Sequence, residues 1–172
     1  TYYARDKTGQ LTGVTGSPYV GVTSYASDIK YRAWGSVKHL SYGNNFTLDL
    51  GYNSRLLAAS FSVSGLMAKT YQYYADGRLE YSRDWIDQRL DRSYGYDHAA
   101  RMVQAFSGAE ARGEPATNDR PYKQTLSHDA WGHMDARTKK HWTGSGGLEL
   151  PSTNSYANNR NTVWSYDSAG NL

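Results

Sequence analysis

Short stretches of alternating aromatic and polar residues recur along this chain, and each stretch ends in a turn. Tyr71 and Tyr73 flank a glutamine, Asp76-Gly77 follows, and Leu79 and Tyr81 resume the alternation on the far side. A period of two is typical of a half-buried strand, and Asp-Gly is a turn signal. The pattern predicts a β-hairpin through these residues.

The same pattern returns at a nearly constant spacing that stretches later in the chain. The copies align on the residue just before each turn, namely Tyr31, Tyr52, Tyr73, Tyr96, His128 and Tyr166. The spacings between these residues are 21, 21, 23, 32 and 38. A further copy starts at Tyr3, with Arg5 where a second aromatic residue is expected. A period of this kind predicts an array of antiparallel β-hairpins, in which extra length goes into loops.

Two stretches fall in the long spacings, residues 107–121 and 143–161. Both are rich in Gly, Pro, Asn and Ser and poor in apolar residues. We expect them to be insertion loops within a single segment of repeats that covers residues 1–172. The first loop is expected to hold a short turn of helix at Ala109 to Arg112.

Two regions between the copies also have patterns that predict strands. The alternation from Leu79 to Trp85 favours an extended segment with a loop at Asp87 to Leu90 over a helix through residues 84–92. Residues 36–52 alternate on both sides of Gly43-Asn44-Asn45, which predicts another hairpin.

Turn chemistry explains why Asp and Gly recur three residues apart. An Asp carboxylate accepts hydrogen bonds from backbone N–H groups two residues on, and the Gly can take a positive φ in a type I turn followed by a bulge. Ala100 stands at one Gly position, where the turn should cost more or differ. Hairpin turns are expected at residues 6–9, 76–77, 129–132 and 167–170. The residues assigned to the structural turn motif are Asp6, Gly9, Gly35, Tyr73, Asp76, Gly77, Tyr96, Asp97, Asp129, Gly132, Tyr166, Asp167 and Gly170.

The composition supports an all-β fold with several times more strand than helix. The chain has 16 Tyr against 3 Phe and 3 Met, together with 5 Trp and 17 Gly, which favours strands and tight turns. The formal net charge of +3 is too small and too dispersed to indicate a nucleic-acid surface. The densest basic cluster, residues 137–141, is typical of a solvated strand face. Because the chain has no Cys, disulfides and thiolate metal sites are excluded. No apolar run approaches the roughly 18 residues that a membrane span needs, so we expect no membrane insertion.

The copies resemble the YD repeats of the RHS family, which includes bacterial polymorphic toxins and the animal teneurins. The resemblance rests on the stretches at residues 40–44, 52–56, 73–79, 96–97 and 166–172, of which Tyr166-Asp167-Ser168-Ala169-Gly170-Asn171-Leu172 is the clearest. It implies a strip of β-hairpins that spirals into a hollow β-shell, which in the toxin members encloses a toxic polypeptide. It also implies a secreted or cell-surface protein. The implied partners are flanking repeats of the parent chain and an enclosed toxin polypeptide, or else a cell-surface glycan or protein.

The chain departs from the family pattern in two respects. Arg32 and Asn53 stand where the family prefers Asp, which weakens the prediction of those turns. The family's shell-closing aspartyl autoprotease region, which lies after the repeats, has no counterpart in residues 1–172. Self-cleavage is therefore not assigned to these residues.

No residue pattern indicates catalysis, a metal site or a cofactor. Asp6, Asp97, Asp129 and Asp167 recur once per structural unit, which turn chemistry explains better than catalysis does. The His residues lack the spacing of a zinc site, and no Gly-x-Ser-x-Gly motif occurs. We expect a protein that is not an enzyme.

Two hypotheses remain for the rows of Tyr and Trp. Aromatic residues at corresponding positions of stacked hairpins can pack across strands, as a structural shell segment requires. Exposed Tyr and Trp can instead hold a sugar, as in an extracellular carbohydrate- or cell-surface-binding module. A glycan array separates the two, because a wall alone should show no saccharide-specific binding. The chain begins and ends inside the motif, so we also expect an internal piece of a longer protein, whose end strands pair with other copies or fray when it is isolated.

Overall fold

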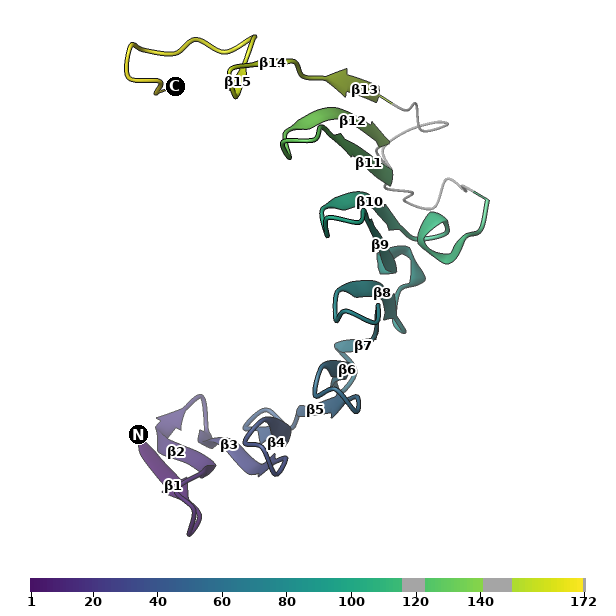
Figure 1. The fold of residues 1–172 in the computed structure, drawn as a ribbon. Helices are drawn as coiled ribbons and strands as arrows, with labels where there is room; N and C mark the ends of the chain where they lie inside the picture. Colours follow the sequence, from purple (N-terminus) through teal and green to yellow (C-terminus); the bar gives the residue numbers. More distant parts are fainter. Residues whose placement is uncertain (116–122, 141–149, 172) are drawn as a thin grey trace. The chain divides into compact units, whose positions relative to one another are not determined.

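The computed structural model describes residues 1–115, 123–140 and 150–171 of the chain (Figure 1). Thirteen antiparallel strands form one sheet in which the strand order follows the sequence. The strands of this sheet are β1 Tyr2–Arg5, β2 Leu11–Tyr19, β3 Val22–Tyr31, β4 Val37–Tyr42, β5 Thr47–Tyr52, β6 Ala58–Val63, β7 Met67–Tyr73, β8 Leu79–Asp84, β9 Arg92–Tyr96, β10 Met102–Ser107, β11 Lys123–His128, β12 Met134–Lys140 and β13 Leu150–Thr153. A separate hairpin joins β14 Tyr156–Ala157 to β15 Arg160–Asn161. The predicted all-β fold is confirmed.

The only helical elements of the described residues are two single 3-10 turns, η1 Gln88–Leu90 and η2 Glu110–Arg112. The first forms because the Asp87 carboxylate accepts the Arg89 N–H at 3.0 Å, which caps the turn. β8 thus ends at Asp84 and β9 begins at Arg92, and the residues between them form a connection with this single turn, so no longer helix runs through residues 84–92. The predicted loop at Asp87 to Leu90 is confirmed, whereas the extended segment stops at Asp84 and does not reach Trp85. η2 lies where the sequence indicated a turn of helix. Among the described residues, no helix has the length and apolar character that crossing a membrane would need.

The chain divides into two compact units. The first holds residues 1–78 and 82–86, and the second holds residues 79–81 and 87–172. Within the first unit β4, β5 and β6 pair directly, with His39 opposite Asp49 and Leu50 opposite Phe61. Within the second unit β11 and β12 pair from Lys123 opposite Lys140 to His128 opposite Met134.

Neither unit contains a thick apolar core in its described part. The buried apolar residues are Ile29 and Leu48 in the first unit and Ala105 and Ala109 in the second. Buried polar side chains outnumber them, namely Ser82, Asp84, Asp91, Ser107 and Asn161. Most described strand residues are half-buried. With so small an apolar core, contacts between neighbouring hairpins become important for stability.

The structure differs from the sequence expectation in the second insertion loop. Leu150–Thr153 is a strand that pairs with β12, with Ala136 opposite Thr153, and the β14–β15 hairpin follows it. The polar composition of this stretch led to the prediction of a loop. Part of that composition belongs to the hairpin tip, where Asn158 and Asn159 take positive φ values of 51° and 61°, which Asn tolerates better than most residues. In the first expected loop, β10 ends at Ser107 and η2 follows. Residues 116–122 and 141–149 of the two predicted loops lie outside the described residues.

Candidate functional site: the motif turns and their links

Connections between consecutive antiparallel strands alternate between the two ends of the strands. We call the end that carries the recurring turns the motif end. In the first unit it holds the turns after β1, β3, β5 and β7, and in the second those after β9 and β11. The other end, which we call the opposite end, carries the connections after β2, β4 and β6 in the first unit, and η1 and the residues after β10 in the second (Figure 1).

The motif turns share one backbone geometry. At Asp6 the backbone N–H donates to the Gln10 carbonyl at 2.9 Å, and the Gly9 N–H donates back to the Asp6 carbonyl at 3.1 Å. The same pair of bonds recurs in turns that start at Arg32, Asn53, Tyr74, Asp97, Asp129 and Asp167, and also at Tyr42 on the opposite end. The structure thus places a turn at each of the four predicted positions, but at residues 167–170 no described strand flanks the turn, so the hairpin predicted there is not formed.

The first side chain of the turn holds the next backbone N–H groups. Asp97 Oδ1 accepts from the Ala99 and Arg101 N–H groups, both at 2.9 Å. Asn53 Oδ1 accepts from the Arg55 and Leu57 N–H groups at 2.9 and 3.1 Å. An amide oxygen therefore replaces the carboxylate at Asn53 without loss of either hydrogen bond.

Asp76 occupies a different position from the other motif carboxylates. The turn begins at Tyr74, so that Asp76 is its third residue and Gly77 its fourth. The Asp76 carboxylate accepts from the Arg78 N–H at 3.0 Å and from Arg78 Nε at 2.7 Å. In this turn, where Tyr74 has no carboxylate to offer, Asp76 at the third position bonds to Arg78, the residue that leads into the next strand.

The fourth residue of each turn has a positive φ whatever its side chain. The predicted glycines Gly9, Gly35, Gly77, Gly132 and Gly170 have φ values between 85° and 92°. Ala100 and Leu56 take the same position with φ of 65° and 63°. The sequence left open that the turn at Ala100 has a different form. It has the same form as the others, and its backbone bonds to Asp97 are present. A left-handed conformation raises the free energy of Ala100, and the hydrogen bonds at both ends of the turn hold the residue in it.

The motif carboxylates remain ionised because the turn hydrogen bonds stabilise their charge. The Thr8 hydroxyl lowers the pKa of Asp6, and the Asn171 amide lowers that of Asp167. Burial raises the pKa of Asp97 and of Asp129, but hydrogen bonds from Arg101 and His133 outweigh it, so that both values are lowered.

Among the described residues, no group of three or more His, Asp or Glu side chains is placed to hold a metal ion. Two His residues lie within ion-pair distance of carboxylates, one of a single Asp and the other of two. His133 Nδ1 lies 2.8 Å from Asp129 Oδ2, and His39 lies between Asp49 at 2.7 Å and Asp28 at 3.5 Å.

Tyrosine hydroxyls link three motif turns of the first unit to the turn before them. Tyr31 donates to the Leu11 carbonyl at 2.9 Å, Tyr52 to the Val37 carbonyl at 2.9 Å, and Tyr73 to the Ala58 carbonyl at 2.7 Å. In each case the donor is the residue just before a turn, and the acceptor is the first strand residue after the preceding motif turn. In the second unit Tyr156 donates to Met134, the equivalent acceptor, at 3.2 Å. We call these contacts the tyrosine links.

Burial raises the pKa of Tyr73, and Tyr71 adds to the shift, so the hydroxyl stays a proton donor. The other two predicted tyrosines have different surroundings. Tyr96 ends β9 and lies opposite Met102. Tyr166 accepts a hydrogen bond from the Asn161 N–H at 3.1 Å and lies under the Arg160 guanidinium.

Arginines also join neighbouring motif turns. Arg55 donates to the carbonyls of Tyr74 and Ala75 at 2.9 and 2.6 Å, and Arg101 donates to the Asp129 carbonyl at 2.7 Å. Aromatic contacts add to these bonds. Trp34 meets Tyr52 edge to face at 5.6 Å, and His133 stacks on Tyr156 at 4.4 Å. Tyr31, Tyr52 and Tyr73, which precede three of the turns, thus take part in hydrogen bonds or ring packing.

A buried polar cluster holds the opposite end of the second unit. Asp91 is fully buried and accepts from the Tyr81 hydroxyl at 3.0 Å and from Arg112 Nη1 at 3.1 Å. Arg112 also donates to the Gln88 carbonyl at 2.8 Å and pairs with Glu114, which raises the Arg112 pKa. The cluster ties η2 to η1. The sequence analysis did not predict this cluster. Its only signal in the sequence was Asp91, at the end of the expected loop.

Sequence reasoning also missed the tyrosine links. Their signal was the excess of 16 Tyr over 3 Phe, because a core that needs only aromatic bulk uses either residue.

Comparisons with known proteins support the fold. No protein-family model and no curated protein sequence matches the chain. The crystal structure of TcdB2-TccC3 without its hypervariable C-terminal region matches with a TM-score of 0.70 at 16% identity, over 92% of this chain and 9% of that one. A structure of the Photorhabdus luminescens Tc holotoxin pore, which carries a TccC3 mutation, matches with a TM-score of 0.71 at 17% identity over the same shares. The chain thus spans about a tenth of the length of these chains. At such identities the likeness shows a shared fold: residues 1–172 have the β-fold of a segment of Tc toxin proteins, while membership in the YD repeats stays a prediction.

Proposed function

We propose that residues 1–172 form a non-catalytic wall segment of an RHS-type β-shell, which scaffolds or encloses another polypeptide in a secreted or cell-surface protein. The observation that carries the proposal is the set of tyrosine and arginine links. They join several neighbouring hairpins through backbone carbonyls, while few apolar residues of the described part are buried. Stability that comes from neighbouring repeats is the property of an extended wall.

Three further observations support this function over catalysis. The motif carboxylates are used by their own turns, so they have no free geometry for acid–base chemistry. The recurring turns repeat a structural unit, whereas a catalytic centre occurs once. The fold match is to chains of Tc toxins, in which a segment of this fold is part of a much larger protein. We propose flanking repeats and an enclosed toxin-type polypeptide as the partners.

Protease protection in the full-length parent protein tests the proposal. We expect a polypeptide inside the shell to survive protease in the native protein. We expect it to be digested at least tenfold faster in a variant that combines Tyr52→Phe, Tyr73→Phe and Arg55→Met, because the wall links are removed. Tyr2→Phe is the matched control, since Tyr2 is 77% exposed. Equal digestion rates in the native protein and the triple variant, or the absence of any protected polypeptide, would contradict the wall function.

A further inference from the structure

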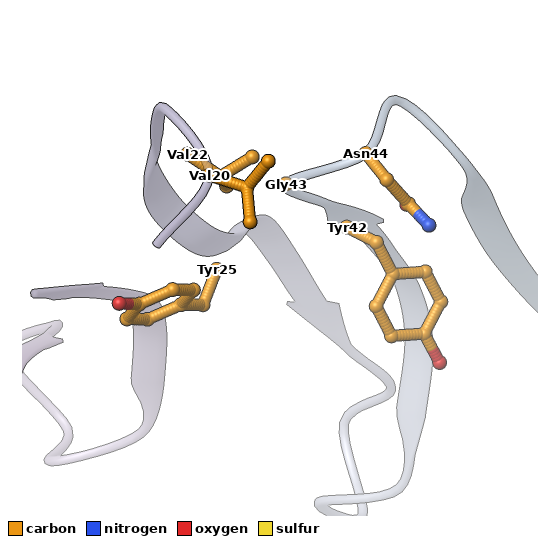
Figure 2. A pocket seen from close by; sticks show the side chains of 6 residues that line it. All are labelled: Val20, Val22, Tyr25, Tyr42, Gly43 and Asn44. Atoms are coloured by element: carbon orange, nitrogen blue, oxygen red, sulfur yellow. The ribbon is translucent and has the colours of Figure 1, made fainter. Parts of the chain in front are cut away.

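Two adjoining hollows lie at the opposite end of β2 to β5 in the first unit, and the wall function does not use them. The first, of about 320 Å³, is lined by Val20, Val22, Tyr25, Tyr42, Gly43 and Asn44 (Figure 2). The second, of about 410 Å³, shares Val22, Tyr42 and Gly43 with the first. It adds a polar lining from Thr23, Ser24, Ser27, Ser41, Asn45 and Thr47.

The chemistry of the two linings is complementary. The first hollow presents aliphatic side chains and two tyrosine rings, and Tyr25 and Tyr42 are 36% and 39% exposed. Figure 2 shows Val20 and Val22 close to Gly43, with Tyr42 and Asn44 extending from the neighbouring strand end. The second hollow presents hydroxyls and an amide. None of the residues that line either hollow is charged, so the site offers nothing to neutralise a phosphate, a carboxylate or an ammonium group.

The hydroxyls form a row across three strands. Ser27 lies opposite Ser41, and Ser41 lies opposite Thr47, so the three side chains share one face of the sheet. Tyr42, the next residue in β4, points to the other face. A ligand that touches both hollows must therefore lie across the end of β4.

The backbone around the hollows is held in place without a ligand. The Gly43 N–H donates to the Tyr25 carbonyl at 3.0 Å, and the Tyr25 hydroxyl donates to the Ser17 carbonyl. A Cβ at Gly43 would collide with the Ser24 carbonyl and would lie 2.7 Å from Val22 Cγ1, so only Gly allows this close approach. A site fixed in advance loses little entropy on binding.

We propose that these hollows bind a neutral oligosaccharide of at least two sugar units. The C–H face of one unit packs on Tyr42 and Val22, and the hydroxyls of the next unit pair with Ser27, Ser41 and Thr47. An apolar peptide side chain would fill the first hollow alone and leave the row of hydroxyls unused. The site lies at the strand end away from the motif turns, so the proposal goes beyond the wall function and does not depend on it.

Saturation-transfer NMR on the full-length parent protein tests the site. The probes are the neutral disaccharides maltose, lactose and diacetylchitobiose, their monosaccharides, and glucose 6-phosphate and sialic acid as charged sugars. We expect at least one neutral disaccharide to receive saturation and to bind at least tenfold more tightly than its monosaccharide, while the charged sugars receive none. Absence of transfer to all three disaccharides, or equal transfer to the charged sugars, overturns the proposal.

Variants locate the binding. Tyr42→Ala should weaken disaccharide binding at least tenfold, whereas Tyr2→Ala, which removes an exposed tyrosine outside the hollows, should leave it unchanged. Thr47→Val keeps the branched shape of the side chain and removes one hydroxyl, and it should weaken binding severalfold with an unaltered fold. If Tyr42→Ala does not fold, Thr47→Val still decides. Unchanged disaccharide affinity in Thr47→Val, together with competition by N-acetyl-leucine amide, shows an apolar peptide site and overturns the proposal.

Discussion

The motif end and the opposite end of the strands solve the same problem of chain reversal in different ways. In the first unit the four motif turns have one backbone geometry, although they start with Asp6, Arg32, Asn53 and Tyr74. At the opposite end the reversals vary: the β4–β5 turn at Tyr42 has the motif geometry, whereas β2 and β3 are joined through Val20 and Gly21, and β6 and β7 through residues 64–66. The motif end is also where tyrosine and arginine side chains bond to the backbone of a neighbouring turn. Four different residues start these turns, so the identity of the first residue does not fix the turn form.

In the second unit the two ends also differ in the lengths of their connections. The motif turns at Asp97 and Asp129 are again alike, while the connection after β10 is long and begins with η2. Its first residues are held by the buried Asp91 and by Arg112. The opposite end thus accepts insertions, provided that a local polar cluster anchors their base.

Breaking that anchor should have the largest effect. Asp91→Ala removes the acceptor of the Tyr81 hydroxyl and of Arg112 in a fully buried site. We expect a loss of about 3 kcal/mol in the free energy of unfolding, measured by urea denaturation. Glu114→Gln is the control, because Glu114 is 53% exposed and should matter much less. Equal losses in the two variants would show that Asp91 is not the anchor.

Backbone strain at the motif end should come next. Gly132 has a φ of 92° and open space around a Cβ except for Arg101 Nη1 at 3.9 Å. Gly132→Val should cost about 1 to 2 kcal/mol, because a β-branched residue resists positive φ. Ala100→Val should cost less, since Ala100 already bears part of the left-handed strain. Thermal melts that rank the two variants equally would contradict the shared turn geometry.

Removing one tyrosine link should have a smaller effect. Tyr73→Phe keeps the ring and loses the hydroxyl bond to Ala58, leaving a half-buried carbonyl without its donor. We expect a loss of about 1 kcal/mol in the free energy of unfolding. Tyr2→Phe should leave the urea midpoint unchanged because Tyr2 is exposed. A midpoint in Tyr73→Phe that equals that of the native chain would mean that the aromatic ring alone stabilises the array.

The smallest expected effect is on the acid side of the stability profile. The motif carboxylates have lowered pKa values in the folded chain, so their stabilisation is complete above the unfolded value near 3.8 and is lost as the pH falls through the folded values. Asp97→Asn should reproduce the Asn53 turn, which makes the same backbone bonds without a charge. We expect this variant to flatten the decline of the urea midpoint between pH 5 and 2 while leaving it nearly unchanged at pH 7. A steeper acid decline in Asp97→Asn would contradict the assignment.

The sequence predicted the strands and the turns because both depend on local chemistry. Alternation fixed the hairpin around Gly43-Asn44-Asn45, and Asp with Gly fixed the turns at residues 129–132 and 167–170. The prediction placed too much weight on Gly at the fourth position of the turn, since Ala100 and Leu56 also adopt a positive φ there. The strand at Leu150–Thr153 was missed because its pairing partner, β12, belongs to a separate stretch of sequence that ends at Lys140.

The links between hairpins could not be predicted, because they depend on the register of one strand against the next. Tyr31 and Leu11 are 20 residues apart, and Tyr52 and Val37 are 15 apart. Nothing in either local pattern marks the carbonyl as an acceptor. The buried Asp91 escaped for a similar reason, since its partner Arg112 belongs to the next connection.

The short span of the tyrosine links bears on how the chain is made. Each link joins a hairpin to the one just before it in the sequence, so a hairpin that leaves the ribosome meets a partner that has already been synthesised. The sequence separations of 15 to 22 residues mean that every link closes a short loop, which is entropically inexpensive and quick. The array can therefore fold in the order of its translation, one hairpin at a time, without waiting for its C-terminal end.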